Sequence, residues 1–104
     1  MNKKKPIKVI LKPSKNKDKK WVVIMNEFGH RHNFGQKGAS DFTIHKDPQR
    51  KENYIKRHRK REDWSDHNSP AFWSKNLLWN KKTISSSIKD IEKNYNLQIT
   101  KKSK

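Results

Sequence analysis

Apolar and polar residues alternate along the first third of the chain, which is the pattern of β-strands with one buried face. Residues 6–13 show this alternation with one extra apolar position at Ile10, and a proline stands at each end of the segment, as an edge strand tolerates. Residues 20–25 form a short run rich in β-branched side chains, typical of a buried strand. Residues 30–35 alternate again. Because the connections are short, we expect these three segments to form an antiparallel β-meander.

A basic helix is predicted after the sheet. Asp47 followed by a proline is a strong helix start, because aspartate caps free amide groups and proline fits the first helical position. We expect this helix to continue to about residue 61 or 63. Tyr54, Ile55 and His58 define a narrow inner stripe, and nearly all other side chains are cationic. A stripe this thin buries too little surface to hold the helix by burial alone.

Two further helices are predicted in the C-terminal half. Ser69 and Pro70 repeat the start signal, and residues 71–79 are so densely apolar that we expect this helix to be the buried centre of the domain. Thr83 caps a third helix, in which apolar residues recur at positions 84, 88, 91 and 95. This spacing places them on one face of the helix.

These elements predict a single α+β domain, with an N-terminal three-stranded antiparallel β-meander followed by three α-helices. We place the domain at residues 6–97, with a basic arm at 1–5 and a basic tail at 98–104. In the linker between the sheet and the first helix, we expect the side chains of Phe42 and Ile44 to pack in the core.

Composition narrows the class of protein. The chain has 104 residues, 27 Lys and Arg against 10 Asp and Glu, and a formal net charge of +17. This length permits one small domain, and no apolar stretch suits a membrane span or a secretory signal. The chain contains no cysteine, which excludes disulfides, thiolate catalysis and cysteine-ligated zinc. We therefore expect an intracellular protein that binds a polyanion, with no membrane partner, small-molecule substrate or cofactor.

Several short motifs along the chain resemble those of one family. They include Phe34-Gly35, Ser40-Asp41-Phe42-Thr43, Phe72-Trp73-Ser74, Leu77-Leu78-Trp79-Asn80 and Ser87-Ile88-Lys89-Asp90-Ile91. On these residues the chain resembles an uncharacterised family of small, lysine-rich proteins encoded by large nucleocytoplasmic DNA viruses. The resemblance covers roughly residues 21–95, although Ser69-Pro70-Ala71 stands where a Gly-containing segment is expected. It implies a viral origin and a place in the virion, but no reaction and no catalytic residue.

The positive charge is concentrated in a run of six basic side chains from Lys56 to Arg61. Few carboxylates oppose it, because only Glu52 and Glu62 flank the run. Such a helix can lie along a nucleic-acid groove and contact phosphates on both sides, and the alternative is a solvated face. The residues that we expect to bind nucleic acid are Arg50, Lys51, Lys56, Arg57, Arg59, Lys60, Arg61, the arm lysines Lys3, Lys4 and Lys5, and Trp64.

The tryptophans and the N-terminal lysines have different expected roles. Trp64 follows the basic run among polar residues, so we expect it to be partly exposed and able to stack on a base. Trp73 and Trp79 stand at helical spacing with leucines and are expected in the core. The N-terminal lysines suit a phosphate-binding arm and hairpin, and equally the protection of an exposed sheet edge.

We predict a small, basic, non-enzymatic viral protein that binds DNA or RNA through phosphates, located in the virion and in the host cytoplasm or nucleus during infection. An alternative is a minor capsid or cement protein that bridges acidic virion proteins. A third is a metal-dependent nuclease in which a histidine with Asp41, Asp47 or Asp63 surrounds a divalent ion. Separately, His30 and His32 point the same way on one strand and could form a metal site with a third ligand. No paired-carboxylate spacing supports the third alternative, so we assign no metal ligands.

Overall fold

Three consecutive strands form the antiparallel meander that the alternation predicts. In the computed structural model, which describes residues 5–103, these strands are β1 (Ile7–Pro13), β2 (Lys19–Met25) and β3 (His30–Gln36). β2 pairs with both of its neighbours. A polar turn joins β1 to β2, and the 3-10 turn η1 (Asn26–Phe28) leads from β2 toward β3.

A fourth strand, β4 (Leu97–Lys101), completes the sheet and corrects the expected topology. All five of its residues pair in parallel with β1, so the strand order is β3-β2-β1-β4 and the sheet is mixed. β1 is therefore an interior strand, not the edge strand that its flanking prolines suggested. Residues 98–101, which we expected in a basic tail, belong to this strand.

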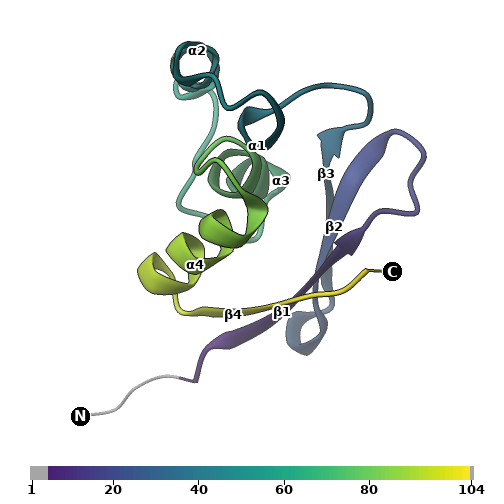
Figure 1. Cartoon of the computed structure of the whole chain (residues 1–104). Helices are drawn as coiled ribbons and strands as arrows, with labels where there is room; N and C mark the ends of the chain where they lie inside the picture. Colours follow the sequence, from purple (N-terminus) through teal and green to yellow (C-terminus); the bar gives the residue numbers. More distant parts are fainter. Residues whose placement is uncertain (1–4, 104) are drawn as a thin grey trace.

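The helices lie on one face of the sheet (Figure 1). α3 (Pro70–Trp73) continues into the π-helical turn η2 (Ser74–Leu78), and α4 (Ile84–Asn94) leads into β4. Phe72 and Trp73 have no exposed surface, so this segment is the buried centre that its sequence predicts. The strands contribute Val9, Leu11, Val23, Met25, Phe34 and Leu97 to the same core.

Each of the three main helices begins at the residue that the sequence indicates. A side-chain oxygen of Asp47 accepts a hydrogen bond from the amide of Gln49 at 3.0 Å and caps α2 (Pro48–His58). The hydroxyl groups of Ser69 and Thr83 cap α3 and α4 in the same way. These bonds satisfy amide groups that have no acceptor within the helix.

The expected end of the basic helix is wrong. α2 stops at His58, and residues 59–61 form a turn in which the amide of Arg61 donates to the carbonyl of His58 at 3.0 Å. The residues after His58 are all charged as far as Asp63, so a longer helix has no apolar surface to bury there. The basic run is therefore split between a helix and the turn that follows it.

The linker before α2 folds into a single helical turn, α1 (Phe42–His45), capped by Asp41. Phe42 is buried as expected, but Ile44 is 60% exposed, which corrects the expectation that both residues reach the core. Successive helical residues point about 100° apart, so residues two positions apart lie on nearly opposite sides of one turn. Once Phe42 faces the core, Ile44 faces solvent.

Candidate nucleic-acid interface

A stack of three aromatic rings attaches α2 to the rest of the protein. Trp79, which follows η2, packs on Tyr54 with ring centroids 4.4 Å apart and planes at 4°. Tyr54 in turn packs on His58 at 4.2 Å. Tyr54 is the buried residue of α2, and burial raises the pKa of its phenol. Because the attachment uses so little of the helix, most of its surface stays open to solvent.

Lys51 differs from the other cations of α2, because its ammonium group is used inside the fold. Its Nζ donates to the carbonyl oxygen of Asn80 at 2.7 Å and lies 5.1 Å from the centre of the Phe42 ring. Partial burial lowers the pKa of Lys51, and the ammonium groups of Lys75 and Lys81 lower it further. This position makes Lys51 a link between α2 and the loop after η2, and its expected contact with nucleic acid stays a prediction.

Five of the predicted cations form the open part of the candidate interface. Arg50 and Arg57 lie on one side of α2 and line a cleft beside it. Arg59, Lys60 and Arg61 are exposed on the turn after the helix. Within residues 5–103, none of these five side chains has an ion-pair partner. We call these five residues the α2 basic surface.

The other predicted lysines contribute less to this surface. Lys56 lies 3.3 Å from Glu52, one helical turn away, and both side chains are more than half exposed. Such a pair adds little stability but compensates part of the charge. Lys5 is exposed at the start of the described chain. Lys3 and Lys4 lie outside the described residues, so their part in binding stays a prediction.

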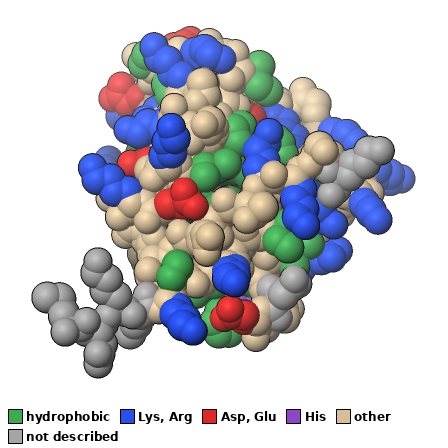
Figure 2. All heavy atoms as spheres, turned by 60° about the horizontal axis from the view of Figure 1, so that its bottom comes forward, with side chains coloured by type: hydrophobic (Ala, Val, Ile, Leu, Met, Phe, Trp, Pro, Cys, Tyr) green, Lys and Arg blue, Asp and Glu red, His purple; other side chains and the backbone are tan. Residues whose placement is uncertain are grey.

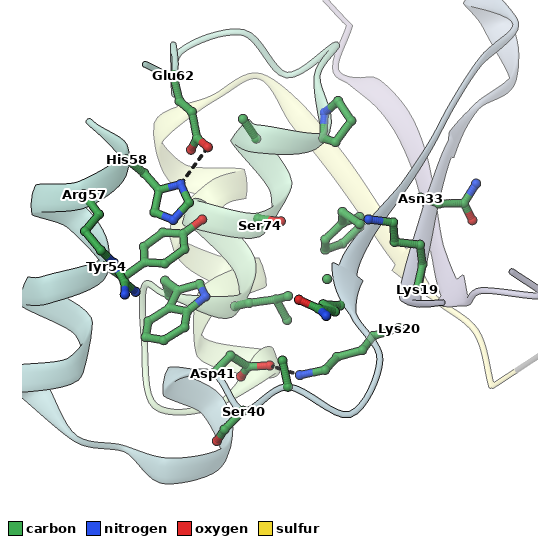
Figure 3. Close-up of a pocket in the computed structure, with 18 of the residues that line it drawn as sticks. Lys19, Lys20, Asn33, Ser40, Asp41, Tyr54, Arg57, His58, Glu62 and Ser74 are labelled. Carbon is green, nitrogen blue, oxygen red and sulfur yellow. Dashed lines mark hydrogen bonds and ion pairs between the residues drawn. The ribbon is translucent and has the colours of Figure 1, made fainter. Parts of the chain in front are cut away.

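A cleft of about 550 Å³ separates α2 from the ends of β2 and β3. Arg50 and Arg57 lie on the helix side of this cleft. Figure 3 shows the Lys19 side chain directed into the cleft from the sheet side, whereas Asn33 points away. The α2 basic surface therefore continues across the cleft to a lysine of the sheet.

An ion pair closes one end of the cleft. Lys20 Nζ lies 2.7 Å from a carboxylate oxygen of Asp41 (Figure 3). The other carboxylate oxygen accepts a hydrogen bond from the amide of Thr43. Asp41 is 2% exposed, so the pair joins β2 to α1 inside the fold. Gly35 sits beside it with φ +78°, and a Cβ there would meet the Leu78 side chain at 2.9 Å. Glycine thus permits the close approach of β3 and η2.

Glu62 joins His58 and Trp64 at the other end of the cleft. One of its carboxylate oxygens pairs with His58 Nδ1 at 2.8 Å, and the other accepts a hydrogen bond from the indole N–H of Trp64 at 2.9 Å. The ammonium group of Lys75 lies 5.3 Å from the centre of the Trp64 ring. Trp64 is partly buried, and its stacking on a base stays a prediction.

A second group of basic side chains lies apart from α2. In Figure 2, Lys and Arg side chains gather at the top of the view, where Figure 1 has α2, and also on the side of the β1–β2 turn. The N-terminal sequence contains the lysines of this second group, but Arg31 on β3 joins them only through the strand register. In the linear sequence Arg31 stands between His30 and His32, apart from any basic run, so its place in this group was not predicted.

The histidines of β3 take part in packing contacts. The rings of His30 and His32 are 6.4 Å apart, and His32 Nε2 is hydrogen-bonded to Asn68 at 2.6 Å. Within residues 5–103, no group of three or more His, Asp or Glu side chains is placed to hold a metal ion. In the same part of the chain, the helices are too short or too polar to cross a membrane.

Part of the chain matches a known protein family. Residues 9–58 are similar to a family of unknown function (DUF5754). The matched segment begins within β1 and ends with α2, so it contains most of the three-stranded meander and the basic helix. It holds only part of the cleft, because lining residues such as Ser74 and Trp79 lie outside it. No curated protein and no solved structure matches the chain.

Proposed function

We propose that this protein binds nucleic acid through phosphate contacts made by the α2 basic surface. The observation that carries the proposal is that Arg50, Arg57, Arg59, Lys60 and Arg61 are grouped on one helix and its following turn without carboxylate partners in the described chain. Uncompensated arginines of this kind contact phosphate oxygens strongly, often through two parallel hydrogen bonds.

The same surface supports binding that is largely independent of base sequence. Phosphate contacts fix the position of a protein on nucleic acid but carry no sequence information. The arginines at 50 and 57 are separated by about two helical turns, which spaces them along a backbone rather than on one base. Lys19, on the far side of the cleft, offers a further phosphate contact.

The biological setting that we propose follows from the resemblance to small lysine-rich viral proteins. In this setting the protein is a non-enzymatic virion component with a packaging or nucleoprotein role. Fractionation of virions tests it, because a nucleoprotein is recovered with the nucleic acid core. Recovery with the outer shell would instead favour a minor capsid or cement role.

Salt titration tests the binding itself. Five phosphate contacts predict that the affinity for a labelled duplex falls about 10²–10³-fold between ~50 and ~200 mM salt. Fluorescence anisotropy measures this, and two duplexes of unrelated sequence are expected to bind alike. An affinity that does not change with salt would overturn the proposal.

A matched pair of variants localises the contacts. The triple substitution Arg57→Gln, Lys60→Gln and Arg61→Gln is expected to reduce the slope of log affinity against log salt by about 3. The control is Lys82→Gln, Lys89→Gln and Lys93→Gln, which removes the same charge from exposed positions on and beside α4. An equal loss in both variants would show that net charge alone, not the α2 basic surface, drives binding.

A further inference from the structure

The face of the sheet that points away from the helices is uncovered within the described chain (Figure 1). Strand register and alternation place its residues, because the core takes the alternate positions. One cross-strand row runs from Arg31 through Ile24 and Ile10 to Thr100. The next row contains Asn33, Val22 and Lys12.

Three cations of this face surround one small hollow of about 160 Å³. Lys12, Lys15 and Arg31 line it, together with Asn33 of β3, Val22 of β2, and Pro13 and Asn16 at the β1–β2 turn. Among the described residues, no carboxylate lines this hollow. Val22 lies beneath it and is only 3% exposed, although no helix covers this face. The lysine and arginine stems that border the hollow therefore shield an apolar residue while their charged ends stay in solvent.

The turn that carries Lys15 is held in place by side-chain hydrogen bonds. The hydroxyl of Ser14 donates to the side-chain oxygen of Asn33 and accepts from the amide of Asn16. These bonds fix the turn over β3, so the approach of Lys15 to Arg31 is built into the fold. Within residues 5–103, neither cation has a carboxylate partner.

Three like charges around one hollow repel each other, and an anion between them removes that repulsion. A phosphate group suits the site, because arginine binds it through paired hydrogen bonds and lysine binds it as a point charge. The charge continues along the same face, where Lys8 and Lys102 line a neighbouring hollow whose only described acidic residue is Glu27. An extended phosphodiester backbone can therefore follow the face from one hollow to the other.

The position of the uncovered face relative to α2 bears on how many segments of nucleic acid one molecule can contact. α2 lies on the helical side of the sheet, opposite the uncovered face (Figure 1). We propose that the uncovered face, centred on Lys12, Lys15 and Arg31, is a second phosphate-binding surface and that the protein bridges two segments of nucleic acid. This proposal rests on the proposed function of α2 as the first contact. A bridge of this kind condenses nucleic acid rather than merely coating it.

A capture experiment tests the bridge. Beads carrying one duplex are loaded with the protein at ~50 mM salt, washed, and offered a second, fluorescent duplex. The wild-type protein is expected to retain the fluorescent duplex on the beads. The variant Lys12→Gln, Lys15→Gln and Arg31→Gln is expected to load onto the beads but to capture the second duplex at least about 10-fold less well.

The controls separate this proposal from the first. The variant with Lys82, Lys89 and Lys93 changed to Gln loses the same charge and should still capture the second duplex; equal losses in both variants would overturn the proposal. If the beads retain wild-type protein but no fluorescent duplex, bridging fails while binding by α2 stands. If they retain no protein, the proposed function fails as well.

Amide chemical shifts give a readout that does not depend on the substitutions. Adding a short duplex to the wild-type protein should shift the amide signals of both Arg31 and Arg57. Shifts at Arg57 alone would overturn the second surface. If a polyglutamate peptide shifts the Arg31 amide signal and the duplex does not, the second phosphate-binding surface is likewise overturned. That result would favour an acidic protein partner.

Discussion

α2 and α4 are both eleven residues long, but they bury very different surfaces. In α4, Ser87 and Ile91 have no exposed surface, and Ile84 and Ile88 pack against the core. In α2, Tyr54 alone is buried. The charges differ in the opposite sense, because α4 carries two cations and two carboxylates, whereas α2 carries four cations and one carboxylate.

The difference shows that, in this small and highly charged chain, core formation and surface charge are assigned to different helices. α4 contributes to the core and is electrically balanced, while α2 contributes charge and is attached at few points. Asn80 connects the two helices, since its side-chain amide donates to Asp90 at 2.7 Å and its carbonyl accepts from Lys51. The rest of a chain of charge +17 repels a cationic helix, so the few contacts that attach α2 must hold it against this repulsion.

The largest expected effect comes from the buried face of α4. Ile91→Ala should lower the free energy of unfolding by about 2–5 kcal/mol, because the cavity lies in a closed core. Urea denaturation followed by circular dichroism measures this loss. Ile44→Ala is the control, because Ile44 is 60% exposed, and it should change stability by no more than about 0.5 kcal/mol. Equal losses of unfolding free energy in the two variants would contradict the claim that the buried face of α4 stabilises the fold.

A smaller effect is expected from the attachment of α2. Tyr54→Leu keeps an apolar side chain but removes two ring contacts, so it should cost about 1–3 kcal/mol. Tyr54→Phe keeps the stack and should be nearly neutral. The same denaturation measurement applies to both variants. If Tyr54→Leu costs more than Ile91→Ala, α2 rather than α4 is the more firmly held helix, and the comparison reverses.

The smallest effect concerns the link between the helices at acid pH. The hydrogen bond from Asn80 lowers the pKa of Asp90, and Lys81 also favours its charged form, against the effect of burial. A carboxyl whose pKa is lower in the folded chain stabilises the fold above its unfolded pKa of about 3.9, and this contribution is lost as pH falls through the folded pKa. Asp90→Asn should therefore lose less stability than the wild-type protein between pH ~5 and ~2.5.

Urea midpoints at several pH values between these limits check the acid-pH prediction. Glu27→Gln is a suitable control, because this side chain is exposed and has no ion pair within residues 5–103. The control should follow the wild-type curve. Parallel curves for Asp90→Asn and the wild-type protein would show that the Asn80 link contributes nothing at acid pH.

Features set by neighbours in sequence were predictable. The helix starts at Asp47, Ser69 and Thr83 depend on a capping side chain and the next few residues, and all three are confirmed. The meander is also confirmed, because alternation and short connections fix which strands pair. The same local rules identified Phe72 and Trp73 as the centre of the core.

Features set by distant contacts were not predictable. Leu97 and Ile99 alternate at the start of a lysine-rich end, but only the free edge of β1 makes that segment a strand. Lys51 looks in sequence like its basic neighbours, yet the carbonyl of Asn80 draws it into the fold. Arg31 joins the lysines of the β1–β2 turn through strand register, which the linear sequence does not show.

The pairing of β1 with β4 has a consequence for synthesis of the protein. Every other described element lies between β1 and β4 in the chain, so β1 emerges from the ribosome well before its parallel partner exists. Until then an edge containing Val9 and Leu11 stays unpaired, and such edges invite association with other chains. The lysines on this strand and the turn after it oppose such association between nascent chains.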